Sequence, residues 1–351
     1  MNKVRVAIVG CGSVSGAYIP HLKSSAYVDL VAVCDTLPGR AQSHAQTYQI
    51  AHYFTDIDQM LRDVDFDLLV NITPMQLHGP FNRKALEAGR HVWCEKPLAT
   101  DLTEAQALLE LARNRGVNLW GAPSSPISPA FQQMAKIIAS GDIGPVFAAH
   151  GLYGSPGPDW EGSGWFYQKG GGVLFDLGVY NITTLTALLG PVQSVVAMAG
   201  TAIPQRVVGS KTVDAEAVDN TALVLDHGNT VYSVIQNGFV YGAQREDWTI
   251  QVLGTKGAMT LGGYDWEPRN VSVLAHGHAS NQWTTTPYKR SDYVWECGAT
   301  YVAECLAKRE KPLLTGEHAA HVLDVMLSAL KAAETGQRVQ LQSTFSWPLG
   351  H

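Results

Sequence analysis

The segment VAIVGCGSVSG at residues 6–16 constrains this chain more than any other. A short β-branched run leads into a Gly-x-Gly turn, and residues with helical spacing follow at once. Gly10 permits the tight turn, and Gly12 lets the backbone approach a phosphate closely. The next helix offers unpaired N–H donors and the positive end of its dipole at its N-terminus. The segment therefore predicts a strand–turn–helix unit that binds a dinucleotide, with Ser13 and Val14 beside the phosphates.

An acidic residue stands where such a unit needs one. Asp35 ends the second β-branched run, roughly 20 residues beyond Gly12, where a carboxylate accepts hydrogen bonds from ribose hydroxyls. It would repel a 2′-phosphate, which favours NAD over NADP, although nearby Arg40 keeps NADP open. Thr36 follows Asp35 directly and joins the expected ribose site. The alternative is that the glycines form an ordinary tight turn.

The first third of the chain alternates short apolar runs with helical segments. Runs of this kind, apolar without alternation, are typical of parallel strands covered on both faces. The succession of strand and helix predicts a doubly wound sheet, an α/β Rossmann domain spanning residues 1–121. The expected strands lie at residues 4–9, 28–34, 67–72, 91–94 and 117–120.

The pattern changes after residue 121. Alternating strand-like runs separated by short turns begin at Val146, and they predict an antiparallel sheet. We therefore expect an α+β second domain over residues 122–351, with an open and mainly antiparallel sheet. Three segments with helical spacing are expected to cover one face of that sheet, at residues 176–189, 293–307 and 318–334.

Composition excludes several classes of partner. The 351 residues carry a formal net charge of −6 and no basic block, so a nucleic-acid partner is not expected. No apolar stretch is long enough for a transmembrane helix, and no membrane partner is expected. Five scattered cysteines without a CxxC motif fit a cytoplasmic protein. No metal is expected, because His276 with His278 reads as a turn and His318 with His321 as helix surface.

A second group of residues follows two expected strands of the first domain. Thr73 and Pro74 come after one strand, His78 lies on the next helix, and Glu95 and Lys96 come after the following strand. Open α/β sheets bind their ligands at the carboxyl ends of the strands. These residues are therefore expected at the cofactor, although Glu95 and Lys96 could also form a solvated charge pair.

A third group follows a run of glycines at residues 170–172. Three glycines before a helix permit close approach of the backbone to a ligand. Asp176 and Tyr180 are four residues apart, which would place both side chains on one face of a helix. A carboxylate beside a phenol can handle a proton. The alternative is a glycine hinge followed by a helix with a half-buried tyrosine.

In this order along the chain, the three groups resemble the glucose–fructose oxidoreductase, inositol dehydrogenase and rhizopine-catabolism (Gfo/Idh/MocA) family. The resemblance continues through the segments AGRHV at 88–92, GDIG at 141–144 and GTKG at 254–257. It implies that Lys96 lies at the nicotinamide and contacts the substrate hydroxyl. It also implies that Asp176 orients the substrate and that Tyr180, a position that is most often His in the family, transfers the proton.

The resemblance further implies a function and an assembly. The expected activity is reversible oxidation of a secondary alcohol on a sugar, a cyclitol or a related polyol. The open sheet is expected to pair subunits face to face, which gives a homodimer or homotetramer. Aromatic rings stack on sugar rings, and polar groups bind hydroxyls. The expected substrate residues besides Lys96, Asp176 and Tyr180 are Tyr153, Asp159, Trp160, Trp165 and Asn181.

Two other functions stay open. Some relatives retain NAD and cleave glycosides or exchange hydride between two sugars. A non-catalytic NAD-binding sensor is the other possibility, and the presence of both Lys96 and Tyr180 argues against it. The tryptophans also have a plain alternative, since Trp160 and Trp165 could simply pack in the core.

Overall fold

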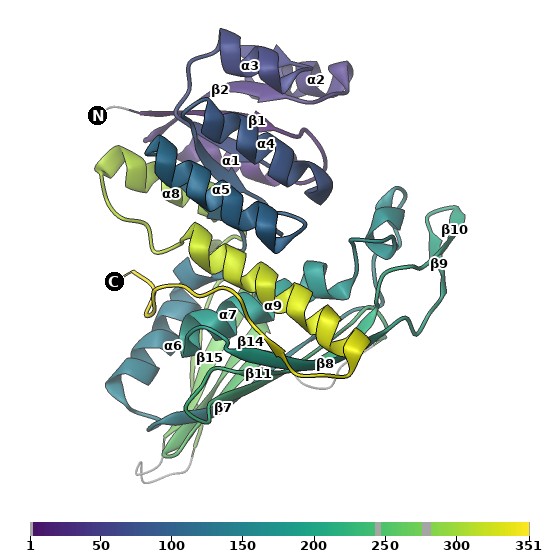
Figure 1. Ribbon diagram of the computed structural model, residues 1–351. Helices are drawn as coiled ribbons and strands as arrows, with labels where there is room; N and C mark the ends of the chain where they lie inside the picture. Colours follow the sequence, from purple (N-terminus) through teal and green to yellow (C-terminus); the bar gives the residue numbers. More distant parts are fainter. Residues whose placement is uncertain (1–2, 243–246, 276–281, 351) are drawn as a thin grey trace. The chain divides into compact units, whose positions relative to one another are not determined.

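The computed structural model describes residues 3–242, 247–275 and 282–350. The chain forms two compact units (Figure 1). The first comprises the residues up to Ser124 together with Trp295–Leu323, and the second comprises Ser125–Val294 and Asp324–Leu349. Among the described residues, no helix combines the length and apolar character that crossing a membrane requires.

The first unit is built on a parallel sheet of six strands in the order β3-β2-β1-β4-β5-β6. This order confirms the predicted Rossmann topology. The direction in which strands are added reverses between β1 and β4, and ligands of such sheets bind outside the carboxyl ends at this point. The strands are β1 (Val4–Val9), β2 (Val28–Cys34), β3 (His52–Phe54), β4 (Leu68–Asn71), β5 (His91–Cys94) and β6 (Leu119–Gly121).

Two helices of the first unit begin at an aspartate that caps them. The Asp101 carboxylate accepts the N–H of Glu104 at 2.8 Å and caps α5, which ends where Gly116 adopts a positive φ of 67°. Asp56 caps α3 in the same way through the N–H groups of Asp58 and Gln59. The helices are α1 (Ser15–Ser24), α2 (Pro38–Tyr48), α3 (Ile57–Asp63), η1 (Met75–Leu77), α4 (His78–Glu87) and α5 (Leu102–Arg115).

Helix α8 (Cys297–Lys308) corrects one expectation. The sequence assigned this segment to the second sheet, but α8 packs on α1 and on strands of the Rossmann sheet (Figure 1). The Thr300 hydroxyl lies 2.7 Å from Nδ1 of His21, and a side chain on Gly298 would collide with the Trp93 ring. Spacing predicts a helix with an apolar face but does not say which sheet that face covers.

The second unit contains a nine-stranded sheet in the order β16-β15-β14-β13-β7-β12-β11-β8-β17. All pairs are antiparallel except β7 with β12, which agrees with the predicted open, mainly antiparallel sheet. The strands are β7 (Val146–Gly154), β8 (Ser194–Gly200), β11 (Asn220–Asp226), β12 (Tyr232–Gly238), β13 (Trp248–Gly254), β14 (Gly257–Tyr264), β15 (Glu267–Ala275), β16 (Thr284–Pro287) and β17 (Val339–Gln340).

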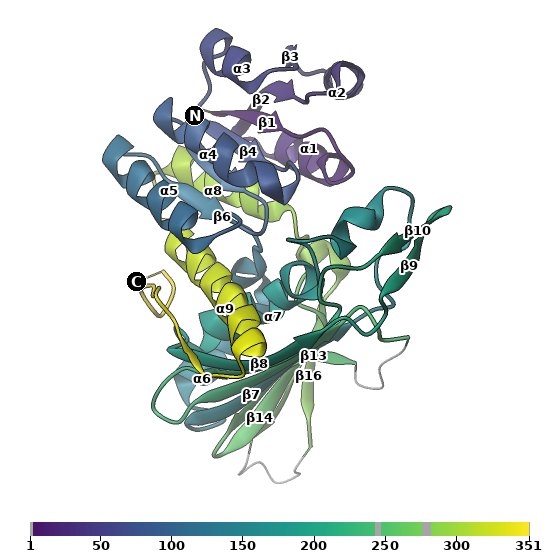
Figure 2. The ribbon, with the colours of Figure 1, turned by 45° about the vertical axis from the view of Figure 1, so that its right-hand side comes forward.

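Helices cover one face of this sheet, and a separate hairpin extends from it (Figure 2). Side chains of β11 and β12 alternate between exposed and buried, as expected for strands with one covered face. The remaining elements are η2 (Ser125–Ile127), α6 (Pro129–Ser140), η3 (Ser163–Tyr167), η4 (Leu174–Gly178), α7 (Val179–Leu189), the hairpin β9 (Gln205–Val208) and β10 (Lys211–Asp214), η5 (Arg290–Asp292) and α9 (Gly316–Thr335).

Candidate active site

The glycine turn after β1 has two different kinds of glycine. Gly10 has a φ of +101°, and a Cβ there would lie 2.7 Å from the carbonyl oxygen of Ile72. Its role is to let β1 and β4 stay close as the chain turns. A Cβ on Gly12 would meet no described protein atom within 4 Å. The fold itself therefore does not require a glycine at position 12, and the open space lies where a pyrophosphate would approach.

Asp35 braces the same turn. Its carboxylate accepts the N–H of Cys11 at 2.8 Å and the N–H of Leu37 at 2.9 Å. These bonds hold the carboxylate at the carboxyl end of β2, where a ribose is expected. Thr36 and Arg40, which the sequence placed beside it, are exposed.

His44 also contacts this turn, and the sequence did not predict its role. Its Nε2 lies 2.9 Å from the Ser15 hydroxyl, which donates to the carbonyl of Gly12 at 2.6 Å. Its Nδ1 lies 2.9 Å from the carbonyl oxygen of Arg40. The ring thus connects α2 to the glycine turn. Nothing in the local sequence signals this contact, since it joins two consecutive crossover helices.

The loops after β4 and β5 are joined through His78. The buried ring has Nδ1 2.6 Å from the carbonyl of Pro97 and Nε2 2.9 Å from the carbonyl of Thr73. Burial lowers the pKa of His78, and the bonds to the two carbonyls oppose that effect. Both ring nitrogens are used within the protein. We therefore assign His78 to positioning Thr73-Pro74 and the Lys96 loop, which corrects the expected contact with the cofactor.

Glu95 fixes the backbone at Lys96. Its Oε1 accepts the Tyr18 hydroxyl at 2.5 Å, and its Oε2 accepts the N–H of Lys96 at 3.0 Å. Trp93 Nε1 in turn donates to the Tyr18 oxygen at 3.3 Å. The Glu95 side chain therefore joins α1 to the loop that follows β5. The side chain of Lys96 is half-buried.

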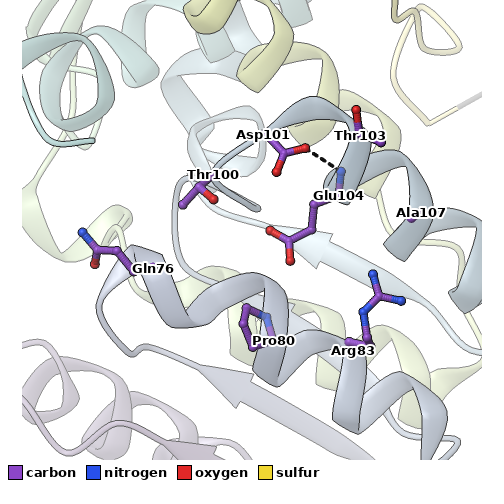
Figure 3. Close-up of a pocket in the computed structure, with 8 residues that line it drawn as sticks. All are labelled: Gln76, Pro80, Arg83, Thr100, Asp101, Thr103, Glu104 and Ala107. Carbon is purple, nitrogen blue, oxygen red and sulfur yellow. Dashed lines mark hydrogen bonds between the residues drawn. The ribbon is translucent and has the colours of Figure 1, made fainter. Parts of the chain in front are cut away.

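A depression of about 550 Å³ on the first unit lies apart from these residues (Figure 3). It lies between α4 and α5, and it contains none of the predicted site residues. The Glu104 carboxylate covers Gly79, since a Cβ there would lie 2.1 Å from its Cδ. The lining residues are Gln76, Pro80, Arg83, Thr100, Asp101, Thr103, Glu104 and Ala107.

In the second unit, two of the three glycines at residues 170–172 pack against the protein itself. A Cβ on Gly171 would lie 2.6 Å from the carbonyl oxygen of Phe166, and one on Gly172 would lie 2.8 Å from that of Val218. Gly172 also has a φ of +102° and donates its N–H to Phe166 at 2.7 Å. At these two glycines, protein backbone fills the space in which the sequence predicted a ligand.

Asp176 and Tyr180 follow in a helix that begins with a turn of π-helix. The structure describes every residue from Gly171 to Leu188, and only Asp176 and Tyr180 among them are not buried. The sequence predicted one regular helix from residue 176, whereas η4 carries Asp176 and α7 carries Tyr180. Single π-turns inside helices occur frequently at functional sites.

Tyr153 lies near both of these side chains. Burial raises the pKa of Tyr153, a hydrogen bond from Trp266 Nε1 at 3.0 Å opposes this, and the charges of Tyr180 and Asp176 raise it further. The Tyr153 ring is buried against Tyr264, with ring centroids 4.7 Å apart. The charges of Tyr180 and Asp176 therefore act on the Tyr153 hydroxyl. Trp266 was missed, since it is far from all three in the sequence.

Asn181 corrects a predicted substrate contact. It is fully buried, and its amide donates to Thr249 at 2.9 Å and to the carboxylate of Asp265 at 3.1 Å. Asn237 donates to its carbonyl oxygen at 2.9 Å. Burial raises the pKa of Asp265, while hydrogen bonds from Thr184, Thr249 and Asn181 lower it. Asn181 belongs to a polar network beneath α7 and does not reach the surface.

The two candidate tryptophans lie at the surface. Trp160 is 58% exposed and Trp165 is 40% exposed, which excludes the alternative that they pack in the core. Trp165 stacks on Phe166 with centroids 3.7 Å apart, so one of its faces is covered. Asp159 is also exposed.

Family models match most of the chain. Residues 4–122 match the oxidoreductase family with an NAD-binding Rossmann fold, and residues 131–260 match the GFO/IDH/MocA C-terminal domain. The chain belongs to the Gfo/Idh/MocA family. This confirms the resemblance seen in the sequence.

Named relatives and solved structures agree with this membership. The scyllo-inositol 2-dehydrogenase (NAD(+)) of Bacillus subtilis is 26% identical over 345 residues, which cover 97% of each chain. The mouse trans-1,2-dihydrobenzene-1,2-diol dehydrogenase is 25% identical over 94% of this chain and 96% of its own. A levoglucosan dehydrogenase, solved with NADH and levoglucosan, matches 97% of this chain and 100% of its own with a TM-score of 0.87 and 18% identity.

The first unit of this Gfo/Idh/MocA protein is an NAD-binding Rossmann domain, as predicted. The residues present fit NAD. Gly12 has free space above its backbone, and Asp35 is held at the carboxyl end of β2. The helix that follows, α1, presents its N-terminus to the same turn.

The sequence predicted no metal site at either of two histidine pairs. His276 and His278 lie outside the described residues. His318 and His321 are buried, not on the helix surface as expected. Burial, with a smaller effect of His321, lowers the pKa of His318 to about 3. In residues 3–242, 247–275 and 282–350, no three His, Cys, Asp or Glu side chains gather as metal ligands.

Proposed function

We propose that this protein is an NAD-dependent dehydrogenase that oxidises a secondary alcohol of a sugar, a cyclitol or a related polyol. One observation carries the proposal: Asp176 and Tyr180 alone remain accessible in an otherwise buried segment, with Tyr153 beside them. A carboxylate and two phenols suit the binding of vicinal hydroxyls and the transfer of one proton. Relatives named for scyllo-inositol and for levoglucosan support this class of substrate.

Different residues of the first unit are proposed to bind different parts of NAD. Gly12, Ser13 and Val14 bind the pyrophosphate through backbone N–H groups. Gly10 donates its own N–H to the carbonyl of Cys34 at 2.8 Å, and it contributes by shaping the turn. Asp35 binds the ribose hydroxyls and disfavours a 2′-phosphate, so NAD is preferred to NADP. The remaining contacts of the cofactor are assigned to Thr36, Arg40, Thr73, Pro74, Glu95 and Lys96.

The chemistry divides between cofactor and protein. When bound, NAD⁺ accepts the hydride that leaves the carbinol carbon. The hydroxyl proton passes to Tyr180, and the products are a ketone and NADH. The ammonium of Lys96 binds the substrate oxygen. Asp176 accepts a neighbouring substrate hydroxyl and so orients the carbinol.

The test is formation of NADH with a panel of inositols, aldoses, levoglucosan and trans-dihydrodiols. Sustained NADH formation with at least one polyol is the expected result. Cleavage of glycosides without net NADH would instead support the NAD-retaining alternative, and NAD binding without any reaction would support a sensor. Either outcome would overturn the proposed dehydrogenase.

We also propose that the open sheet pairs two copies of this chain. Its uncovered face carries large exposed apolar side chains, of which Met198 is 79% exposed. Apolar patches of this kind mark interaction surfaces. Light scattering is expected to give a dimer or tetramer, and Met198→Glu is expected to lower the mass, whereas a monomeric wild type would refute the pairing. The patch comprises Val196, Met198, Val224, Tyr232 and Val234.

A further inference from the structure

The two exposed tryptophans belong to a loop that the rest of the second unit holds firmly. We call residues 155–168 the tryptophan loop, since it carries Trp160 and Trp165. Exposed aromatic rings on an ordinary loop would be mobile, because surface loops have few fixed contacts. This loop, in contrast, is bound at its base, in its middle and at its end.

The hairpin β9–β10 binds the middle of the tryptophan loop. Gly209, at the turn of the hairpin, donates its N–H to the carbonyl of Asp159 at 2.6 Å. Ser210 donates its N–H and its hydroxyl to the Glu161 carboxylate at 3.2 and 3.3 Å. These contacts flank Trp160 on both sides in the sequence, so they fix the backbone that carries its ring.

Arg206, on β9, binds the base of the loop. Its Nη1 donates to the carbonyl of Pro156 at 3.0 Å and to that of Phe239 at 2.9 Å. Its Nη2 donates to the Asp219 carboxylate at 2.7 Å, and its guanidinium lies 5.0 Å from the centre of the Tyr167 ring. One planar cation therefore joins the start of the loop, its end and the residue that follows strand β12.

Asp219 and Tyr167 complete this network. The buried Asp219 carboxylate also accepts the N–H groups of Ala202 at 2.7 Å and Ile203 at 3.0 Å, just before the hairpin. The Tyr167 hydroxyl donates to the carbonyl of Pro158 at 2.7 Å. Burial raises the pKa of Tyr167, and the Arg206 cation opposes this. Both ends of the tryptophan loop are thus held by polar contacts within the second unit.

The buried ion pair of Arg206 and Asp219 does not make the fold more stable than apolar residues in the same place would. Taking a guanidinium and a carboxylate out of water carries a large desolvation penalty, and well-packed apolar residues are often as stable. What the ion pair provides instead is geometry, since the fork of Arg206 reaches three acceptors at once. A rigid loop that presents exposed rings binds a ligand with less loss of conformational entropy.

We propose that Arg206, together with Asp219, is a positioning residue for substrate specificity. It holds the tryptophan loop so that the open faces of Trp160 and Trp165 stack on the apolar face of a pyranose or cyclitol ring. This inference rests on the proposed dehydrogenase function and names the part of the second unit that selects the ring. Arg206 itself contacts no substrate.

The test is a mutant cycle between Arg206→Met and Trp160→Leu/Trp165→Leu, which removes both rings that Arg206 is proposed to position. Arg206→Met and the tryptophan variant are each expected to raise KM for the best polyol by about tenfold or more. The value of kcat is expected to stay within about twofold, since stacking binds ground state and transition state alike. In the Trp160→Leu/Trp165→Leu background, Arg206→Met is expected to add little, because its effect passes through the two rings. Additive effects on KM would overturn the proposal.

Arg90→Met is the matched control. Arg90 likewise lies over an aromatic ring, with its guanidinium 5.2 Å from the centre of Phe66, and it donates to the Asp65 carboxylate at 2.8 Å. It belongs to the first unit, whereas the tryptophan loop belongs to the second. Its KM for the polyol is expected to match the wild type. If Arg90→Met raised KM as much as Arg206→Met, the effect would reflect stability only.

Two further measurements keep the result decisive. If Arg206→Met fails to fold, the variant Arg206→Met/Asp219→Asn removes the unpaired buried carboxylate and replaces it in the cycle. Hydrogen exchange of residues 155–168 is measured in parallel and needs no substrate. Arg206→Met is expected to speed exchange there and not at the glycine turn. If no polyol reacts, the proposed function fails, while unchanged exchange in the loop refutes the positioning role independently.

Discussion

Glycines that precede predicted site residues occur in both units, and they do different things in the two units. At the turn after β1, Gly12 has open space where a side chain would be. In the run at 170–172, Gly171 and Gly172 are packed against carbonyl oxygens of the protein. The first glycine leaves room for a ligand, and the other two let the chain pack tightly under Asp176.

The comparison teaches how a glycine run is to be interpreted. A glycine indicates a ligand-binding site only where no protein atom occupies the space that its side chain would fill. Where protein atoms fill that position, glycine is required by packing, and its effect on function passes through the residues it supports. Four substitutions test these assignments. The first replaces Tyr180, which follows the packed glycines in the chain.

Tyr180→Phe is expected to have the largest effect. The substitution removes the proposed proton acceptor and keeps the ring, so kcat is expected to fall by roughly 10²–10⁴. The Kd for NAD is expected to stay unchanged. Steady-state kinetics and a fluorescence titration with NADH measure the two quantities. Tyr53→Phe, at an exposed tyrosine of β3, is the control. Turnover close to that of the wild type would exclude Tyr180 as the acceptor.

Gly172→Ala is expected to destabilise the second unit. Alanine disfavours a φ of +102°, and its methyl group would lie 2.8 Å from the Val218 oxygen. The expected loss is about 2–4 kcal/mol in the free energy of unfolding, measured in urea. Gly170→Ala is the matched control, because position 170 has a φ of +88° but no described atom within 4 Å. Equal losses in both variants would show that packing is not the cause.

Gly12→Ala is expected to affect the ligand and not the fold. No described protein atom lies within 4 Å of the new methyl group, so the free energy of unfolding should change by less than about 0.5 kcal/mol. The Kd for NAD is expected to rise about tenfold, equivalent to about 1.4 kcal/mol. Calorimetric titration measures it, with Gly39→Ala on α2 as the control. An unchanged Kd would contradict the assignment of Gly12 to the pyrophosphate.

Asp35→Asn is expected to have the smallest effect. An amide oxygen still accepts one of the two backbone N–H groups, while the charge that repels a 2′-phosphate is lost. The ratio of kcat/KM for NAD to that for NADP is expected to fall by less than about tenfold. Asp29→Asn, exposed on the same strand, should leave the ratio unchanged. A higher preference for NAD would refute the role of this charge.

The candidate site residues of the two units were predictable to different extents. In the first unit, Asp35 and Lys96 follow directly on strands, so locating the strands also located the side chains. In the second unit, the sequence singled out Asp176 and Tyr180 but placed them in one regular helix, where the structure has a π-turn. It also expected Asn181 at the substrate, although that side chain is buried against Asp265.

The sequence by itself determined the doubly wound Rossmann sheet and the glycine turn, because a strand, its turn and its crossover helix are contiguous in the chain. Only the tertiary structure decided that α8 joins the first unit, that Trp266 reaches Tyr153, and that Arg206 holds the tryptophan loop. Each of these contacts depends on a partner far away in the sequence. Hydrophobic periodicity shows that a surface must be buried, but the choice of its partner is made by the packing of the whole unit.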